Sequence, residues 1–256
     1  MEIKSKENNQ IKYIKNLFQK KFRDENKEYI VEGTKLVEEA MEYSNVSKII
    51  ISSTYSKKEE IIKISKDMEI IEVSDNLFSY LSDTKSPQGI MAVVKQNLNQ
   101  KIKKDDILFI LDDIQDPGNL GTIIRTLDSA GYKSLVLSKN TVDVYNSKVV
   151  RSTMGAIFRI NFIKLDMELS RYIKSLKEED YKIAVTSLKD SYKIYDFDFN
   201  NKIAIIMGNE ANGVEKEIFE LADYKINIPM IGKTESLNVA VATSIIAYEK
   251  VRRANN

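Results

Sequence analysis

Residues able to do chemistry occur in three loops of the second half of the chain. The first loop is followed by Asn119 and Arg125, the second contains Glu210, and the third contains Ser236 and Asn238. An arginine can bind an anion or stabilise a developing negative charge. The 256-residue chain has no His and no Cys, which excludes histidine base catalysis and thiol nucleophiles and argues against a zinc site.

The first loop follows a short apolar run and holds a Pro117-Gly118 turn. We predict that Asn119 caps the next helix, whose free N–H groups make a ready anion site. Arg125 lies about one turn into that helix and can face the same opening. The glycine spacing is not the dinucleotide fingerprint, which disfavours a nicotinamide enzyme. The alternative is a structural turn followed by a surface arginine.

In the second loop a buried strand is predicted to run directly into Gly208-Asn209-Glu210. Gly208 lets a ligand approach the backbone, and Glu210 places a carboxylate at the mouth of the strand. The alternative is a β-turn with a capping acid.

The third loop follows a strand end at Asn227 and is marked by Pro229 and Gly232. A helix is predicted from Leu237 onward, capped by Glu235 or Ser236. Small side chains fill much of this helix, so it can lie close against another backbone. Its larger apolar residues fall on one face: Leu237, Val241, Ile245, Tyr248 and Val251.

The elements around these loops predict a three-layer α/β domain with a mostly parallel sheet. Four short, β-branched runs suit strands buried on both faces. Ligands on such sheets lie outside the carboxyl ends of the strands. The predicted strands are Ile107–Leu111, Leu135–Leu137, Ile183–Val185 and Ile203–Met207, and the predicted helices are Leu120–Ala130, Lys148–Ile157 and Met167–Glu178.

The first half predicts a smaller α/β module, because strand and helix patterns alternate. It begins with a basic helix over Gln10–Arg23, which can meet phosphates or form a solvated lysine-rich face. The polar stretch Lys95–Lys104 is the best linker candidate. We therefore expect one domain over residues 1–95, a linker over 96–104 and a second domain over 105–256. The other predicted elements are a short strand, a glycine turn and a helix within Tyr29–Ala40, further strands at Lys48–Ser52, Glu69–Val73 and Ile90–Val94, and helices at Lys57–Lys66 and Asn76–Leu81.

Composition sets broad limits on the class of protein. The hydrophobic fraction of 43% supports a sizeable core, and the formal net charge of +1 means that any basic surface is local. No apolar run has membrane length, and the N-terminus lacks a signal-peptide core. We expect a cytoplasmic protein with no membrane partner and no metal.

The three loops together resemble the three motifs of the SpoU/TrmH branch of the SPOUT RNA methyltransferases. The first matches through Asn119-Leu120-Gly121 and Arg125, the second through Gly208-Asn209-Glu210, and the third through Pro229 and Ser236-Leu237-Asn238. The order and separations also match. More loosely, the first ninety residues resemble the ribosomal-protein-like substrate-binding domain of many family members, through Phe22-Arg23, Tyr29–Gly33 and Pro87–Gly89.

The resemblance implies a trefoil-knotted α/β domain that binds S-adenosylmethionine and forms a homodimer through the C-terminal domain. Gly208, Ile228 and Leu237 would contact the cofactor, helped by Met230 and Ser187. It further implies an RNA partner. Arg23 and Glu32 would lie near the RNA-facing surface, with Lys20 and Lys21 as further RNA-binding candidates.

The implied reaction is methyl transfer to a ribose 2′-OH of RNA, with ribosomal RNA favoured over tRNA. Family proposals make the motif-one arginine, here Arg125, a general base. Stabilising the developing oxyanion is physically easier, because arginine does not deprotonate in proteins. Glu210 would orient Arg125, and Asn119, Ser236 and Asn238 would fix the ribose and the loop. Two alternatives stay open, which are a non-catalytic RNA-binding protein of the same fold and a methyltransferase acting on a base nitrogen.

Overall fold

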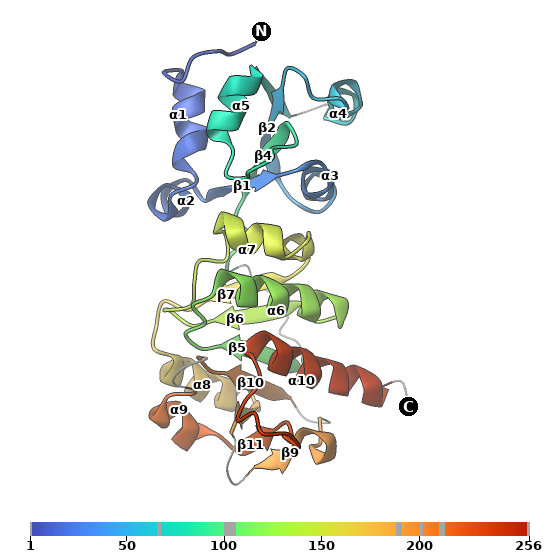
Figure 1. The fold of residues 1–256 in the computed structure, drawn as a ribbon. Coiled ribbons are helices and arrows are strands. Elements are labelled where there is room, and N and C mark those ends of the chain that lie inside the picture. The colour runs from blue at the N-terminus through green and yellow to red at the C-terminus, as the bar shows by residue number, and fades with distance from the viewer. Residues whose placement is uncertain are drawn as a thin grey trace. The chain divides into compact units, whose positions relative to one another are not determined.

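The structure is a computed structural model that describes residues 2–65, 68–99, 106–187, 191–199, 202–209 and 213–254. Packing divides the chain into two units (Figure 1). The N-terminal unit consists of Met1–Gln96 and Asp143–Phe158, and the C-terminal unit consists of Asn97–Val142 and Arg159–Asn256. This division differs from the expected one, in which 105–256 was a single domain, because Asp143–Phe158 packs with the N-terminal unit.

The N-terminal unit is built on a four-stranded sheet with strand order β1-β4-β2-β3. The β1–β4 and β4–β2 pairs are antiparallel, and β2–β3 is parallel. Its elements are α1 (Asn9–Asn16), α2 (Lys20–Asn26), β1 (Glu28–Glu32), α3 (Thr34–Tyr43), β2 (Val46–Ser52), α4 (Lys58–Ile64), β3 (Glu69–Val73), α5 (Asp75–Leu81), β4 (Ile90–Lys95), α7 (Ser147–Ser152) and the 3-10 helix η1 (Ala156–Phe158).

Helices cover both faces of this sheet. On one face, α1 and α5 pack against Ile30, Ile50 and Met91. Strand side chains alternate between faces, so Tyr29 points the other way. There its ring meets Tyr145 just before α7, with centroids 4.3 Å apart. The second face is therefore completed by a segment distant in sequence.

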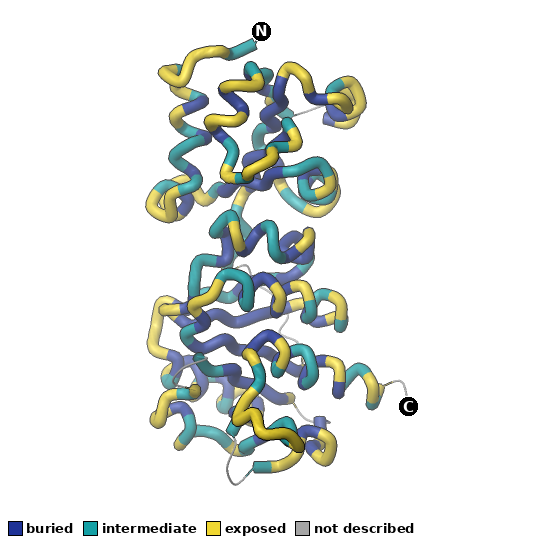
Figure 2. Tube along the Cα trace, viewed as in Figure 1, coloured by how far each residue is buried: buried dark blue, intermediate teal, exposed yellow. Residues whose placement is uncertain are grey.

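The C-terminal unit has a seven-stranded sheet of order β7-β6-β5-β10-β8-β11-β9 in which each neighbouring pair is parallel. Its central strands are buried (Figure 2). Its elements are β5 (Ile107–Leu111), α6 (Pro117–Ser129), β6 (Ser134–Leu137), β7 (Asn161–Lys164), α8 (Leu169–Glu178), β8 (Lys182–Thr186), β9 (Tyr192–Lys193), η2 (Ile194–Asp196), β10 (Ile203–Met207), α9 (Lys216–Leu221), β11 (Tyr224–Asn227) and α10 (Val239–Ala254).

Two pairs of helices cover this sheet. On one face, α8 and α9 pack against Leu108, Val185 and Ile206. Phe109 points to the opposite face and meets the ring of Tyr132, whose hydroxyl donates to the Ala247 carbonyl of α10. Helices α6 and α10 lie together on that side. The predicted three-layer α/β architecture is confirmed.

Some expected elements differ in extent. The basic segment Gln10–Arg23 forms two helices instead of one. Helix α1 ends at Asn16 and α2 begins at Lys20. The predicted helix Lys148–Ile157 divides into α7 and η1, interrupted at Met154 and Gly155, whose φ angles are 50° and 89°. These left-handed conformations end a helix. No helix in the described ranges is long and apolar enough to cross a membrane.

Candidate active site

Four loops that carry predicted site residues, or lead directly into the helix that carries them, begin at one edge of the C-terminal sheet. They follow β5, β10, β8 and β11, which are adjacent and parallel, so their carboxyl ends share that edge. This is where ligands bind on such sheets. Gly208 follows β10, Ser187 follows β8 and Ile228 follows β11. The Ser187 N–H donates to the Ile226 carbonyl at 2.9 Å.

Helix α6 begins differently from our prediction. Asp116, rather than Asn119, is its N-cap, and the Asp116 side chain accepts a hydrogen bond from the Asn119 N–H at 2.8 Å. Pro117 follows as the first helical residue, a position that needs no N–H donor. The Asn119 side chain is thereby left to reach another loop.

Asn238 joins the first and third motif loops. Its Nδ2 donates to Asn119 Oδ1 at 3.0 Å, and its Oδ1 accepts from the Ala240 N–H at 2.9 Å. Asn238 therefore caps α10, and our expectation of Glu235 or Ser236 as the cap was wrong. The same Asn238 amide therefore fixes the start of α10 and links it to Asn119, which holds the two loops in a fixed relative position.

Arg125 is exposed on α6, two turns after the helix begins. Its guanidinium makes no hydrogen bond or ion pair with another residue that the structure describes; only its carbonyl is engaged, by Ser129 Oγ. An exposed arginine whose guanidinium contacts no other described residue can bind a phosphate or a developing oxyanion. Ser236 is also exposed.

Backbone hydrogen bonds join Asn209 to Gly213 after β10. The N–H groups of Asn209 and Gly213 each donate to the other's carbonyl, at 3.1 and 2.9 Å. A Cβ at Gly208 would lie 2.4 Å from the Gly213 carbonyl carbon, so this position requires glycine. Asn209 Nδ2 donates to the Asp113 carbonyl at 2.8 Å, tying this loop to the first. Glu210, the predicted partner of Arg125, lies outside the described residues.

The loop after β11 carries the other predicted cofactor residues. Ile228, Met230 and Leu237 are each partly buried. Their apolar side chains and nearby backbone groups can contact a bound molecule that is itself partly apolar. No group of three side chains able to hold a metal occurs in the described parts of the chain.

Asp112 is an acidic residue near the candidate site that we did not predict from the sequence. It directly follows β5 and is 7% exposed. Burial raises its pKa to about 6, and the negative charges of Glu215 and Asp113 act in the same direction, against a hydrogen bond with Ser138. A carboxyl immediately after a fully apolar strand was the signal that could have identified it.

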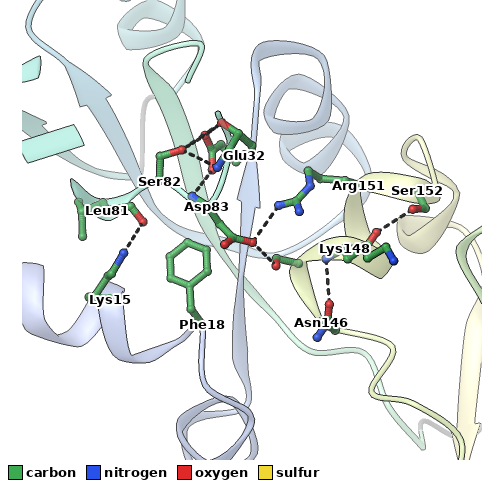
Figure 3. A network of polar contacts seen from close by, with 12 residues as sticks. Lys15, Phe18, Glu32, Leu81, Ser82, Asp83, Asn146, Lys148, Arg151 and Ser152 are labelled. Atoms are coloured by element: carbon green, nitrogen blue, oxygen red, sulfur yellow. Dashed lines mark hydrogen bonds and ion pairs between the residues drawn. The ribbon is translucent and has the colours of Figure 1, made fainter. Parts of the chain in front are cut away.

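Two predicted RNA-binding residues are buried in the N-terminal unit instead. Arg23 is 3% exposed; its Nη1 donates to the Leu17 and Phe18 carbonyls, and its Nε and Nη2 donate to Asp143 at 3.0 and 2.6 Å. Glu32 accepts hydrogen bonds from the loop after α5 (Figure 3). Both side chains therefore serve the fold rather than a surface that contacts RNA.

The two lysines of the predicted RNA-binding set are exposed on α2. Lys20 forms an ion pair with Asp24, and the Lys21 ammonium lies 5.9 Å from the centroid of the Phe22 ring. They remain available to solvent.

The larger apolar residues of α10, which we predicted to share one face of the helix, lie partly at the surface. Val241 and Tyr248 are 47% and 46% exposed, whereas the small residues Ala240, Thr243 and Ala247 are buried. The slim side of the helix packs inward, as its small residues predicted, and part of the larger apolar row faces outward.

Comparison with known proteins identifies two family models and several relatives that match this chain. The model of the SpoU rRNA methylase family matches residues 106–248, and that of the MRM3-like substrate-binding domain matches residues 8–92. The 23S rRNA (guanosine(2553)-2′-O)-methyltransferase RlmP of Bacillus subtilis is 35% identical over 251 residues, which span 96% of this chain and 98% of that protein.

Solved structures agree along nearly the whole chain. The AdoMet-bound rRNA methyltransferase of Sinorhizobium meliloti is 30% identical with a TM-score of 0.88, covering 99% of this chain and 98% of that one. The SpoU methyltransferase AviRb of Streptomyces viridochromogenes, in complex with AdoMet, is 25% identical with a TM-score of 0.86, covering 97% and 99%. With the family model spanning the parallel-sheet half and relatives aligned from end to end, this chain belongs to the SpoU rRNA methylase family.

Proposed function

We propose that this protein transfers the methyl group of S-adenosylmethionine to a ribose 2′-OH of ribosomal RNA. The hydrogen bond between Asn238 and Asn119 carries this proposal, because it joins two motif loops at the start of the helix that bears Arg125. The names of the relatives, one a 23S rRNA 2′-O-methyltransferase, support the reaction and the substrate class. The intact loop residues argue against a binding protein without chemistry.

The cofactor site lies in the loops after β10, β8 and β11. S-adenosylmethionine supplies a methyl group made electrophilic by its sulfonium. Ile228, Met230 and Leu237 offer partly buried apolar contacts, and Gly208 and Ser187 offer backbone at neighbouring strand ends. The two relatives solved with AdoMet support this assignment.

The reaction needs alignment and charge stabilisation from the protein. The protein would have to hold the 2′-OH in line with the electrophilic methyl carbon, and the hydroxyl proton would pass to solvent as the oxygen takes the methyl group. Arg125 binds the target phosphate and stabilises the developing oxyanion, since its guanidinium keeps its proton. Asn119, Ser236 and Asn238 fix the ribose and the loop. Glu210, at the family's second motif, orients Arg125.

Three further features belong to the proposal. The N-terminal unit binds RNA, as the name of the matching substrate-binding model suggests, with Lys20 and Lys21 as candidate contacts. The exposed Val241 and Tyr248 on α10 support a homodimer through the C-terminal unit. The trefoil knot and the cytoplasmic location stay predictions.

Labelled S-adenosylmethionine incubated with unmodified 23S rRNA, and separately with tRNA, tests the function. We expect label in 23S rRNA that is recovered as a 2′-O-methylnucleoside after hydrolysis, and none with Arg125→Ala. Label recovered on a base would overturn the ribose assignment. Label only in tRNA would overturn the substrate class, and failure to bind S-adenosylmethionine would overturn the cofactor site.

A further inference from the structure

The segment Asp143–Phe158 is assigned to different units by its position in the sequence and by its packing. In sequence it lies between β6 and β7 and within the residues matched by the methylase family model. In the structure it packs with the N-terminal unit. We call it the crossover segment. The chain therefore passes between the two units at three places, namely after Gln96, after Val142 and after Phe158.

A buried ion pair fixes the start of the crossover segment. Arg23 of α2 donates to Asp143 through Nε and Nη2, and the side chains are 4% and 15% exposed. Asp143 Oδ1 also accepts from the Tyr145 N–H at 3.0 Å, and the Tyr145 ring packs on Tyr29. A buried charge pair of this kind fixes geometry strongly, because loss of either partner leaves an uncompensated charge.

A second, more exposed contact fixes α7. Asp83 accepts from Ser147 Oγ at 2.5 Å and from Arg151 Nη1 at 3.1 Å, while its own N–H donates to Glu32 (Figure 3). Glu32 thus holds the loop that presents Asp83 to α7. This explains the burial of Glu32 by a role within the same network.

Each end of the crossover segment continues into a residue that is hydrogen-bonded within the C-terminal unit, one to the loop after β5 and the other to α6. The Val142 N–H donates to the Ile114 carbonyl, in the loop after β5, at 2.9 Å. Arg159 donates to Asp128 of α6 through Nε and Nη2, at 3.0 and 2.9 Å to Oδ2. The segment that docks on the N-terminal unit is therefore covalently continuous with anchors on the loop and the helix that carry Asn119 and Arg125.

We propose that the crossover segment couples RNA held by the N-terminal unit to the reaction centre, with Arg23 and Asp143 as positioning residues and Asp83 and Arg151 as weaker ones. This inference rests on the proposed function. RNA and cofactor each bind to their own unit. Methyl transfer requires the target nucleotide to lie in line with the cofactor, which small misplacements disturb strongly.

The test measures catalysis and binding separately in the full chain carrying Arg23→Met. We expect kcat at saturating 23S rRNA to fall about 10- to 100-fold, while the Kd values for RNA and for S-adenosylmethionine each stay within about two-fold. Lys57→Met, which removes an exposed ion pair with Glu38 in the same unit, is the control and leaves kcat unchanged. Arg23→Lys is expected to restore part of kcat, because it returns a charge to Asp143.

A second variant guards against a simple loss of folding. Asp83→Ala with Arg151→Ala removes the more exposed contact, and we expect kcat to fall about three-fold with both Kd values unchanged. An unchanged kcat in both folded variants would overturn the proposal. So would a fall in kcat matched by an equal loss of binding. Absence of methyl transfer by the wild type would instead overturn the proposed function. The coupling role is overturned separately, by variants that lose no kcat while the wild type is active.

Discussion

The two units use arginine in opposite ways. Arg23 is buried in the N-terminal unit with its donors occupied by two carbonyls and Asp143. Arg125 is exposed in the C-terminal unit, with a guanidinium that binds no other described residue. Burying a guanidinium is unfavourable unless its donors are satisfied, so Arg23 is committed to one geometry. Arg125 keeps its donors for a ligand. Exposure and occupancy, rather than residue type, separate the two roles.

The largest expected effect on stability comes from the buried arginine. Arg23→Met should lower the free energy of unfolding by about 3 kcal/mol, because it leaves the partly buried Asp143 carboxylate without its cation. Denaturant unfolding monitored in the N-terminal unit measures this. Lys20→Met, whose ion pair is exposed, should change it by less than about 0.5 kcal/mol. A loss from Arg23→Met as small as the control's would remove the contrast between the two arginines.

The exposed arginine should show the reverse pattern. Arg125→Ala is expected to lower kcat/KM about 10²- to 10³-fold, as loss of a charge-stabilising donor does, with stability within about 0.5 kcal/mol of wild type. Steady-state methyl transfer and thermal unfolding test both halves. Arg171→Ala, an exposed arginine on α8, is the control and should leave both unchanged. A large loss of stability would assign Arg125 to the fold.

Asp112 extends the comparison to a buried acid whose charged neighbours are also acids. Its folded pKa of about 6 lies above the ordinary 3.8, so the folded state holds the proton more tightly. Ionisation therefore destabilises the fold as pH rises from about 4 through about 6. Asp112→Asn should gain on the order of 2 kcal/mol over wild type above about pH 7, and nothing below about pH 4.

Denaturant midpoints at the two pH values measure the Asp112 effect. Asp166→Asn, at an exposed acid, should show no pH-dependent gain. An Asp112→Asn gain that is equal at both pH values would mean that ionisation is not its cause.

The smallest expected effect concerns the link between the motif loops. Asn238→Ala removes the cap of α10 and should cost about 1 kcal/mol of stability. It also removes the hydrogen bond to Asn119 that joins the two motif loops, so we expect activity to fall further than the stability change explains. Ser236→Ala should cost no cap energy. Equal stability of the two variants would place the cap elsewhere, and thermal unfolding decides this.

Apolar runs allowed much of the fold to be predicted. Ile107–Leu111 and Ile203–Met207 are strands over their full predicted lengths, because runs buried on both faces leave a strong local signal. Strands β7 and β9 were missed. Asn161–Lys164 has two apolar residues and Tyr192–Lys193 is two residues long, so neighbouring strands rather than local pattern define them.

Site prediction succeeded where the residues lie in loops after strands, and was less successful where long-range partners decide. Sheet topology brings the loops with Gly208, Ser187 and Ile228 to one edge, as expected for a parallel sheet. The burial of Arg23 was not predictable, because its partner Asp143 is 120 residues away. The cap of α10 was also not predictable, because several polar side chains precede the helix and the path of the backbone decides which of them reaches its first N–H groups.

The crossover segment has a consequence for synthesis on the ribosome. The first 96 residues emerge long before Asp143, so the nascent N-terminal unit presents Arg23 and Tyr29 without their partners. Domains often fold as they emerge, and contacts of large sequence separation form late. The N-terminal unit can therefore reach its final packing only after Phe158 has left the exit tunnel, when β5 and β6 are already made.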